Sequence, residues 1–368
     1  MATLDGKIRL LRGLLTGEVA KTGPFYVDVG ITRRCNLRCL GCRYHSSYVD
    51  ITPQPNSDVK DIPLDLFKRL CDELKTMSTH SLILQGAGEP FLHRDLFEMV
   101  STAKAAGFHV TLLTNGTLLD QDIIQALMDT RLDILKVSLW ASSTEQYQQN
   151  YPDNNPDNFR KIVDGLKLLE SLKAERGSML PMVQLHHPIN CYNFETVDAF
   201  VNLAVTTGCN GVTFSPFNDF WGALAAYGLT ADQEQLARRS LLRAREQLDS
   251  LSMTHNIDDV LFRYEVGAAV WQKLPCYVPW FHVRITVDGA VLPCGRCKLG
   301  FGNLNENSFQ DIWNGPAIRA FRRRTLTRKG LEAMVKDCNC GFCCYVGDNM
   351  RIHRLFGGLS PFVRRFRD

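Results

Sequence analysis

The stretch FYVDVGITRRCNLRCLGC, residues 25–42, decides the fold of this chain and points to its chemistry. Its first part, residues 25–32, is rich in β-branched and aromatic residues, which favours a buried strand. Cys35, Cys39 and Cys42 follow in the loop directly after that strand. Because parallel sheets bind ligands at the carboxyl ends of their strands, this loop is the first candidate for a metal site.

In the rest of the N-terminal two thirds, further strand patterns alternate with helical patterns. Apolar residues at i, i+3, i+4 spacing separate the β-branched runs, and this strict alternation predicts βαβ units around a parallel sheet. Six such units are too few for a closed eight-stranded barrel, so the expected fold class is α/β, an open, partial (β/α)6 TIM-like barrel. The expected strands are 25–32, 81–86, 109–114, 133–139, 182–189 and 211–216, and the expected helices are 64–77, 95–107, 120–130 and 158–175.

A change of pattern after residue 217 indicates a second part of the chain. The expected organisation is a helical segment at 1–23, the barrel core at 24–217, a helical linker at 218–275 and a small extension at 276–368. The extension begins with a β-hairpin that turns at Asp288-Gly289. A helix near 308–313, a basic helix at 316–329, a cysteine-dense segment and a basic tail follow it.

Composition excludes several classes of protein. With 45% hydrophobic residues, the 368-residue chain has enough apolar material for a large core. The net charge of +3 is too small to indicate a nucleic-acid binder. No run approaches 18 apolar residues, and the N-terminus lacks a secretory signal, so no membrane span and a cytoplasmic location are expected.

The 13 cysteines fall into two groups. In a reducing compartment so many thiols are more consistent with metal binding than with a disulfide framework. Three lie between 35 and 42 and seven between 276 and 344. We interpret both groups as metal sites, and the remaining Cys71, Cys191 and Cys209 as small buried apolar residues.

The first group, CxxxCxxC, is typical of an iron–sulfur cluster. Thiolates are the preferred ligands of such clusters, and three of them leave one iron of a four-iron cluster open to bind another molecule. Zinc is the alternative, but this spacing offers no fourth Cys or His nearby to close a structural zinc site. Burial of three spaced thiols on a strand-end loop is the other alternative and is less favoured still.

Three further motifs stand at the ends of the next strands, at residues 86–90, 114–117 and 136–139. With the cysteine loop they make the chain resemble the radical S-adenosylmethionine enzymes. In that family the element similar to GAGEP holds the amino group of the methionyl moiety. The other two elements lie near the carboxylate and the ribose of S-adenosylmethionine. The resemblance therefore implies that S-adenosylmethionine is bound by Gly86, Ala87, Gly88, Glu89, Pro90, Asn115 and Ser138.

The same resemblance implies the first half of a mechanism. A reduced [4Fe-4S] cluster cleaves bound S-adenosylmethionine, and the resulting 5′-deoxyadenosyl radical abstracts a hydrogen from a substrate. A flavodoxin- or ferredoxin-type protein is the implied electron donor, and no nucleic-acid partner is expected. The chain departs from the family at Gly41, where an aromatic residue is often found, so an aromatic contact to the adenine is in doubt.

The second cysteine group resembles the SPASM and shorter twitch extensions of this family. Cys276 and Cys294 enclose the expected hairpin, and residues 302–304 and 311–314 resemble further elements of that extension. The longer cysteine run of a full SPASM module is missing, so one auxiliary [4Fe-4S] cluster is expected. Its expected ligands are Cys276, Cys294, Cys340 and Cys343, with Cys297, Cys338 and Cys344 as rivals. A zinc ribbon from Cys294, Cys297, Cys340 and Cys343 is the alternative.

The substrate is less well determined. Strand-end positions make His186, Asp219 and Trp221 candidates for substrate contact. The main hypothesis is oxidation, by dehydrogenation, or other modification of a small metabolite such as a sugar or aminocyclitol. Alternatives are maturation of a ribosomally synthesised peptide, radical epimerisation with a cysteine as hydrogen donor, and a non-catalytic electron carrier or zinc-ribbon interaction protein.

Overall fold

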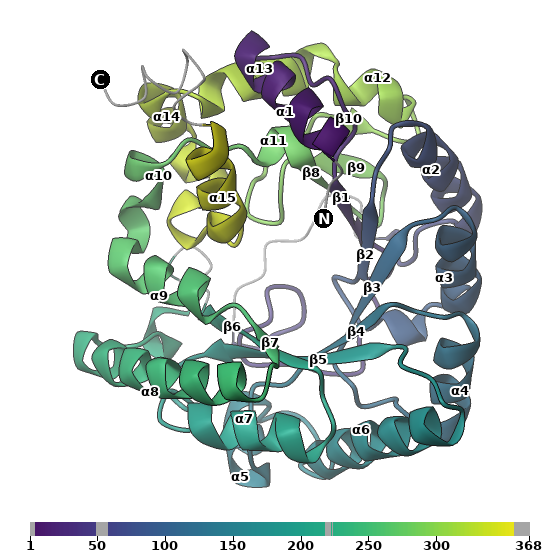
Figure 1. Cartoon of the computed structure of the whole chain (residues 1–368), viewed down its shortest axis with the longest axis vertical. Helices are drawn as coiled ribbons and strands as arrows, with labels where there is room; N and C mark the ends of the chain where they lie inside the picture. Colours follow the sequence, from purple (N-terminus) through teal and green to yellow (C-terminus); the bar gives the residue numbers. More distant parts are fainter. Residues whose placement is uncertain (1–3, 49–57, 218–221, 223, 357–368) are drawn as a thin grey trace.

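The centre of the computed structural model is one curved sheet of ten strands, in the order β10-β9-β8-β1-β2-β3-β4-β5-β6-β7 (Figure 1). The structure describes residues 4–48, 58–217, 222 and 224–356. The strands are β1 (Tyr26–Gly30), β2 (Ser81–Gln85), β3 (His109–Thr114), β4 (Ile134–Ser138), β5 (Met182–Ile189), β6 (Gly211–Pro216), β7 (Thr254–His255), β8 (His282–Ile285), β9 (Ala290–Leu292) and β10 (Gly302–Asn303).

The sheet is the open barrel that the sequence predicted. Strands β1 to β6 pair in parallel, each with the next along the chain. The two edge strands, β7 and β10, lie at opposite ends of the strand order and do not pair with each other. All six strands expected from the sequence are present, and their ends differ from the expected ends by at most two residues.

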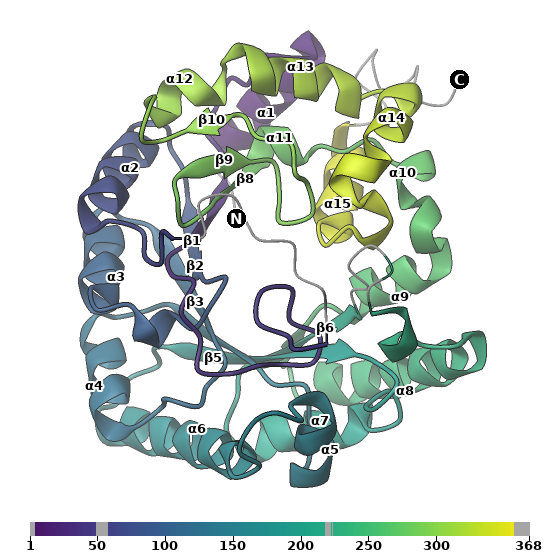
Figure 2. The ribbon, with the colours of Figure 1, turned by 180° about the vertical axis from the view of Figure 1, so that it is seen from behind.

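Helices cover the outer face of this sheet (Figures 1 and 2). The α2 helix shows why: its buried residues recur at i, i+3, i+4 and i+7, which gives one apolar side for the strands. The helices of this part are α1 (Leu4–Thr16), α2 (Leu64–Thr76), α3 (Leu96–Ala105), α4 (Gln121–Asp129), α5 (Thr144–Asn150), α6 (Asn158–Glu175), α7 (Val197–Thr206), α8 (Ala231–Ser250) and α9 (Ile257–Val266).

The inner face of the barrel carries polar side chains. Alternate residues such as Leu135 and Val137 are completely buried and belong to the hydrophobic core. Ser138 lines a cavity at the carboxyl end of the sheet. Because side chains alternate along a strand and paired residues share a face, Lys136 and His186 lie on the same inner face as Ser138. A polar inner face suits a polar ligand.

The C-terminal extension continues the same sheet. Strand β8 pairs in parallel with β1 on the side away from β2, with Tyr26 opposite His282. The predicted hairpin is present, and Gly289 takes a φ of +83° at its turn, a conformation that favours glycine. The helices of this part are α10 (Val270–Lys273), α11 (Val278–Phe281), α12 (Phe309–Trp313), α13 (Pro316–Thr325), α14 (Arg328–Cys338) and α15 (Val346–Phe356).

The expectation of one basic helix at 316–329 is wrong. The structure has two helices there, α13 and α14, because the Thr327 hydroxyl accepts a hydrogen bond from the Gly330 N–H and so begins a new helix.

A buried arginine joins the two ends of the chain. Arg322 of α13 is fully buried and stacks over the ring of Trp313, 4.6 Å from its centroid. Its guanidinium donates to the carbonyl oxygens of Pro279 (2.9 Å), Glu18 (3.0 Å) and Trp313 (2.9 Å), and to Oδ1 of Asn314 (2.7 Å). This network explains why α1 lies beside α13 in both ribbon views (Figures 1 and 2).

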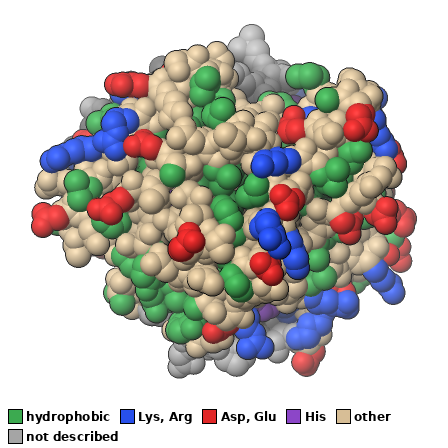
Figure 3. Space-filling model, turned by 90° about the horizontal axis from the view of Figure 1, so that it is seen from below, with side chains coloured by type: hydrophobic (Ala, Val, Ile, Leu, Met, Phe, Trp, Pro, Cys, Tyr) green, Lys and Arg blue, Asp and Glu red, His purple; other side chains and the backbone are tan. Residues whose placement is uncertain are grey.

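Charges are mixed over the outer surface. Figure 3 shows acidic and basic side chains interspersed over the face it displays, without one sign covering it. Within the described residues, the structure holds no helix with the length and apolar character that a bilayer crossing requires.

Candidate functional site

The loop after β1 places three thiols on one cavity. Cys35, Cys39 and Cys42 line a space of about 220 Å³ at the carboxyl ends of β2, β3 and β4. Backbone N–H groups point at two of the sulfurs: Leu37 N lies 3.5 Å from Cys35 Sγ, and Tyr44 N lies 3.3 Å from Cys42 Sγ. Such N–H donors stabilise sulfur that carries negative charge.

The chemistry of these thiols fits an iron–sulfur cluster. Burial raises the pKa of the Cys35 thiol to about 11 and that of Cys39 well above its usual range. The neighbouring thiolates of Cys42 and Cys35 raise the pKa of Cys39 further, so the three sulfurs lie within electrostatic reach of one another. Three thiolates this close need a cation between them, which bound iron supplies.

The end of β2 approaches the cysteine loop so closely that glycine is required. A Cβ on Gly88 would lie 1.9 Å from the carbonyl oxygen of Arg34, in the loop just before Cys35. The next residue, Glu89, donates its N–H to the same carbonyl at 2.6 Å. The GAGEP segment therefore packs directly on the cysteine loop. Its residues 86–89 form one wall of the cavity, whereas Pro90, also expected at the cofactor, is not among the residues that line it.

The Glu89 carboxylate connects two strand ends. It accepts hydrogen bonds from the Thr114 hydroxyl (2.8 Å) and from the backbone N–H of Asn115 (2.7 Å) and Phe91 (3.2 Å). Burial nevertheless raises its pKa to about 7. A positively charged group brought to this carboxylate would favour its ionised form.

The ends of β3 and β4 complete the cavity wall. Asn115 and Ser138 both line it, as the sequence analysis expected. The Asn115 amide donates to Asn36 Oδ1 at 2.9 Å, and Asn36 donates to Thr117 Oγ1 at 2.8 Å. These bonds link the TNGT segment to the cysteine loop, so all four strand-end motifs meet at one place.

The sequence analysis missed Trp140, which lines the same cavity. A Cβ on Gly41 would lie 2.7 Å from ring atoms of both Trp140 and Phe217. The two rings meet edge to face with centroids 6.0 Å apart, and the Trp140 indole donates to Ser138 Oγ at 3.1 Å. An aromatic ring therefore lies beside the cysteine loop although residue 41 is glycine. The signal in the sequence was an aromatic residue two positions after Ser138.

His45 was also missed. It follows Cys42 by three positions, lines the cavity, and places Nε2 2.8 Å from the carbonyl oxygen of Ala87. Burial lowers the pKa of its imidazole, so the neutral ring is favoured. His45 therefore links the end of the cysteine loop to the GAGEP segment.

Of the residues expected to contact substrate, one can be placed. His186 lies on the inner face of β5 with Nδ1 3.0 Å from the hydroxyl of Thr213. Burial, then the positive charge of Lys136, lowers the pKa of its imidazole to about 3. Asp219 and Trp221 lie outside the described residues.

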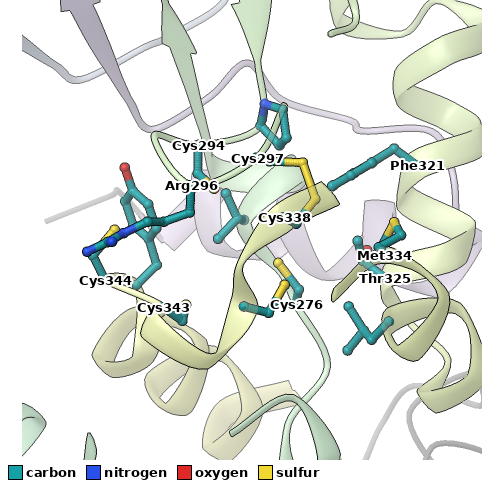
Figure 4. Close-up of a pocket in the computed structure, with 15 residues that line it drawn as sticks. Cys276, Cys294, Arg296, Cys297, Phe321, Thr325, Met334, Cys338, Cys343 and Cys344 are labelled. Carbon is teal, nitrogen blue, oxygen red and sulfur yellow. A yellow bond between two sulfur atoms is a disulfide. The ribbon is translucent and has the colours of Figure 1, made fainter. Parts of the chain in front are cut away.

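A second group of thiols faces another cavity, in the C-terminal extension (Figure 4). Cys276, Cys294, Cys340 and Cys343 all line it. Burial raises the pKa of Cys276, and the thiolates of Cys343, Cys340 and Cys294 raise it further. The four sulfurs named from the sequence therefore lie within electrostatic reach of one another, and their number and chemistry fit a fully ligated cluster.

The three rival thiols are placed differently. Cys297 and Cys338 are joined in a disulfide, which the cysteine pattern did not predict (Figure 4). With Cys297 bonded to Cys338, the zinc-ribbon set loses one of its four ligands. Cys344 also lines the cavity but is exposed to solvent.

Fold and sites together define an iron–sulfur protein built on an open α/β barrel. The family model described as the radical SAM superfamily matches residues 29–191, and the SPASM model, an iron–sulfur cluster-binding domain, matches residues 276–350. The chain belongs to the radical SAM superfamily and has a SPASM domain. Both parts of the resemblance read from the sequence are thus confirmed.

Solved structures share this fold. Streptococcus suis SuiB bound to the precursor peptide SuiA superposes with a TM-score of 0.63 at 14% identity, covering 94% of this chain and 75% of SuiB. Native anSMEcpe with bound AdoMet (S-adenosylmethionine) gives a TM-score of 0.62 at 16% identity, covering 82% and 84% of the two chains. At this level of identity the likeness shows the fold.

Proposed function

We propose that this radical SAM enzyme oxidises a small polar metabolite inside its barrel, using one auxiliary cluster as electron acceptor. The observation that supports the radical chemistry most strongly is the convergence of Cys35, Cys39 and Cys42 with the ends of β2, β3 and β4 on one cavity. With a [4Fe-4S] cluster and S-adenosylmethionine bound there, the site would supply a 5′-deoxyadenosyl radical able to abstract hydrogen.

The residues of the chain orient the cofactor. Glu89 offers its carboxylate to the amino group of the methionyl moiety, while Gly88 lets the GAGEP backbone come close to the cysteine loop. Trp140 presents its indole ring to the cavity, where it would pack against the adenine of bound S-adenosylmethionine in place of an aromatic residue at position 41. Asn115 and Ser138 offer polar groups for the carboxylate and the ribose.

The inner face of the barrel supports a polar substrate. Lys136 and His186 lie there, on the strands next to the cysteine cavity. The low pKa of His186 keeps its ring neutral, so it serves as a hydrogen-bond partner.

The second cysteine group supports oxidation as the outcome. Loss of a hydrogen atom leaves a substrate radical, and loss of one proton and one further electron completes a two-electron oxidation. A cluster held by Cys276, Cys294, Cys340 and Cys343 would accept that electron. This role predicts that the extension is needed for product formation and not for cleavage of S-adenosylmethionine.

Maturation of a peptide is the second candidate. The observation that favours it is the shared fold with SuiB, whose structure was solved bound to the precursor peptide SuiA. In that case the same radical chemistry would act on a residue of a peptide that enters the barrel.

An experiment with fractionated cell extract separates the two candidates. Reconstituted enzyme with reductant and S-adenosylmethionine forms 5′-deoxyadenosine slowly without substrate, and the true substrate accelerates that formation. We expect acceleration by the small-molecule fraction and not by the peptide fraction. Acceleration by the peptide fraction alone would contradict a small-metabolite substrate and favour peptide maturation. The Cys39→Ala variant, which cannot hold the first cluster, is the negative control for both fractions.

A further inference from the structure

A cavity apart from the two cysteine sites lies between the barrel and the extension. It has a volume of about 280 Å³ and is lined by Phe217 after β6, by Arg263 and Tyr264 of α9, and by Gly341 between the auxiliary ligands Cys340 and Cys343. Phe217 also packs edge to face against Trp140, which lines the cavity of the first cysteine site. The cavity therefore lies beside residues of both cysteine sites.

Arg263 is a partly buried cation whose negative neighbours are the thiolate forms of Cys343 and Cys344. Over the described ranges of the chain, no carboxylate lies within ion-pair distance of its guanidinium, and the guanidinium donates no hydrogen bond. Removal from water lowers its pKa, although the group remains charged at neutral pH. An anion in this cavity would give the guanidinium the hydrogen-bond acceptor that the described residues do not supply.

Tyr264 adds a hydrogen-bond donor beside that cation. Its hydroxyl oxygen is buried and has no hydrogen-bond partner in the part of the chain that the structure describes. Buried polar atoms normally find a partner, and those that lack one are commonly found where a ligand binds. The carboxylate on the same cavity, Glu234, lies 3.9 Å from Arg238 one turn further along its own helix.

We infer that the substrate is an anion whose carboxylate or phosphate group binds Arg263 and Tyr264. This inference rests on the proposed function and narrows its substrate to acidic metabolites, which excludes a simple amine. Guanidinium and phenol hydroxyl together match the oxygens of either anion, because a guanidinium can donate two parallel hydrogen bonds and the phenol one more.

Direct binding of simple anions tests this site without any turnover. The reconstituted enzyme, without reductant or S-adenosylmethionine, is titrated calorimetrically with inorganic phosphate and separately with acetate. We expect one anion to bind per chain, and the tighter of the two probes identifies the anionic group of the substrate. Loss of a charge-assisted hydrogen bond should weaken binding about tenfold or more in Arg263→Gln, and less in Tyr264→Phe.

Control variants separate a specific site from general charge. Arg245→Gln removes a cation that pairs with Asp258 on the outer surface and should leave anion binding unchanged. Arg263→Lys keeps the charge without the two parallel donors and should retain part of the affinity. Iron content and circular dichroism of each variant show that its fold and clusters are intact.

Two results would overturn the inference. One is absence of phosphate and acetate binding to the wild-type enzyme, or equal binding in wild type and Arg263→Gln. The other concerns the nearby thiols of Cys343 and Cys344, whose negative charges act on Arg263. If Arg263→Gln shifted the midpoint potential of the auxiliary cluster and left anion affinity unchanged, Arg263 would belong to the cluster and not to the substrate.

Failure of this inference is distinguishable from failure of the proposed function. Formation of 5′-deoxyadenosine by an enzyme that binds no anion would leave the radical chemistry standing and remove the anionic substrate. Anion binding to an enzyme that forms no 5′-deoxyadenosine would leave the anion site standing and remove the proposed radical chemistry.

Discussion

At the scale of single residues, Gly41 and Trp140 form one packing unit. The indole of Trp140 occupies the space that a side chain at position 41 would need. We predict that Trp140→Ala weakens S-adenosylmethionine binding about tenfold or more, since loss of an aromatic ring stacked on a base costs about 1–3 kcal/mol. Equilibrium binding to the reconstituted, oxidised enzyme measures this.

A double variant gives this prediction a matched control. Gly41→Phe alone would clash with Trp140 and Phe217, whereas Gly41→Phe with Trp140→Ala returns a ring to the same space. The double variant should therefore bind better than Trp140→Ala. Equal affinity of wild type and Trp140→Ala would show that the indole does not contact the cofactor.

Glu89 makes the binding of S-adenosylmethionine depend on pH. Its folded-state pKa of about 7 means that the carboxyl group is largely protonated below that pH, and only the ionised form attracts an ammonium group. Affinity should therefore rise between about pH 6 and about pH 8, by up to about tenfold per pH unit. Calorimetric Kd values across this range measure the effect.

The variant Glu89→Gln is the control for this pH dependence. It cannot ionise, so its affinity should be lower and should lack the rise that Glu89 produces. A rise of the same size in Glu89→Gln would assign the pH dependence to another group, for instance to His45 in the same cavity.

At the scale of elements, the local pattern of the sequence was enough to predict the strands of the barrel. Each strand from β1 to β6 is a short β-branched run between amphipathic helices, and such runs are visible without knowledge of the partner strand. The parallel pairing of β8 with β1 was not predictable, because it joins segments about 250 residues apart and depends on tertiary packing. The break between α13 and α14 needed recognition of one capping threonine, Thr327.

The candidate site likewise combines features that the local sequence predicts with features that only tertiary packing reveals. The cysteine loop and the strand-end motifs were visible as local patterns, and the structure brings them to one cavity. Trp140, His45 and Arg263 were not named because a single aromatic or basic residue has no distinctive local pattern. Only their positions on cavities, set by contacts between distant elements, point to a role.

The contact between α13 and the N-terminal segment depends on Arg322. We predict that Arg322→Ala lowers the free energy of unfolding by about 3 kcal/mol or more, since it leaves several buried acceptors without a donor. Arg319→Ala, on the same helix, removes only an exposed ion pair with Glu18 and should cost less than about 1 kcal/mol. Urea unfolding followed by circular dichroism compares them, and equal losses would contradict the role of Arg322.

At the scale of the whole molecule, one continuous sheet positions both cysteine groups. The sheet that holds the first group is extended by the hairpin that holds part of the second, because β8 pairs with β1. We predict two four-iron clusters, about eight irons per reconstituted chain. Cys276→Ala should retain about four irons and still form 5′-deoxyadenosine, while a full iron content in Cys276→Ala would contradict the auxiliary assignment.

The central claim is that Cys35, Cys39 and Cys42 hold the cluster that cleaves S-adenosylmethionine. The most direct test is 5′-deoxyadenosine formation by anaerobically reconstituted enzyme with a strong reductant, compared between wild type and Cys39→Ala. We predict 5′-deoxyadenosine from the wild type and none from Cys39→Ala, although that variant retains the iron of its auxiliary cluster, about four atoms per chain. Absence of 5′-deoxyadenosine from the wild type with every reductant, or equal formation by Cys39→Ala, would contradict it.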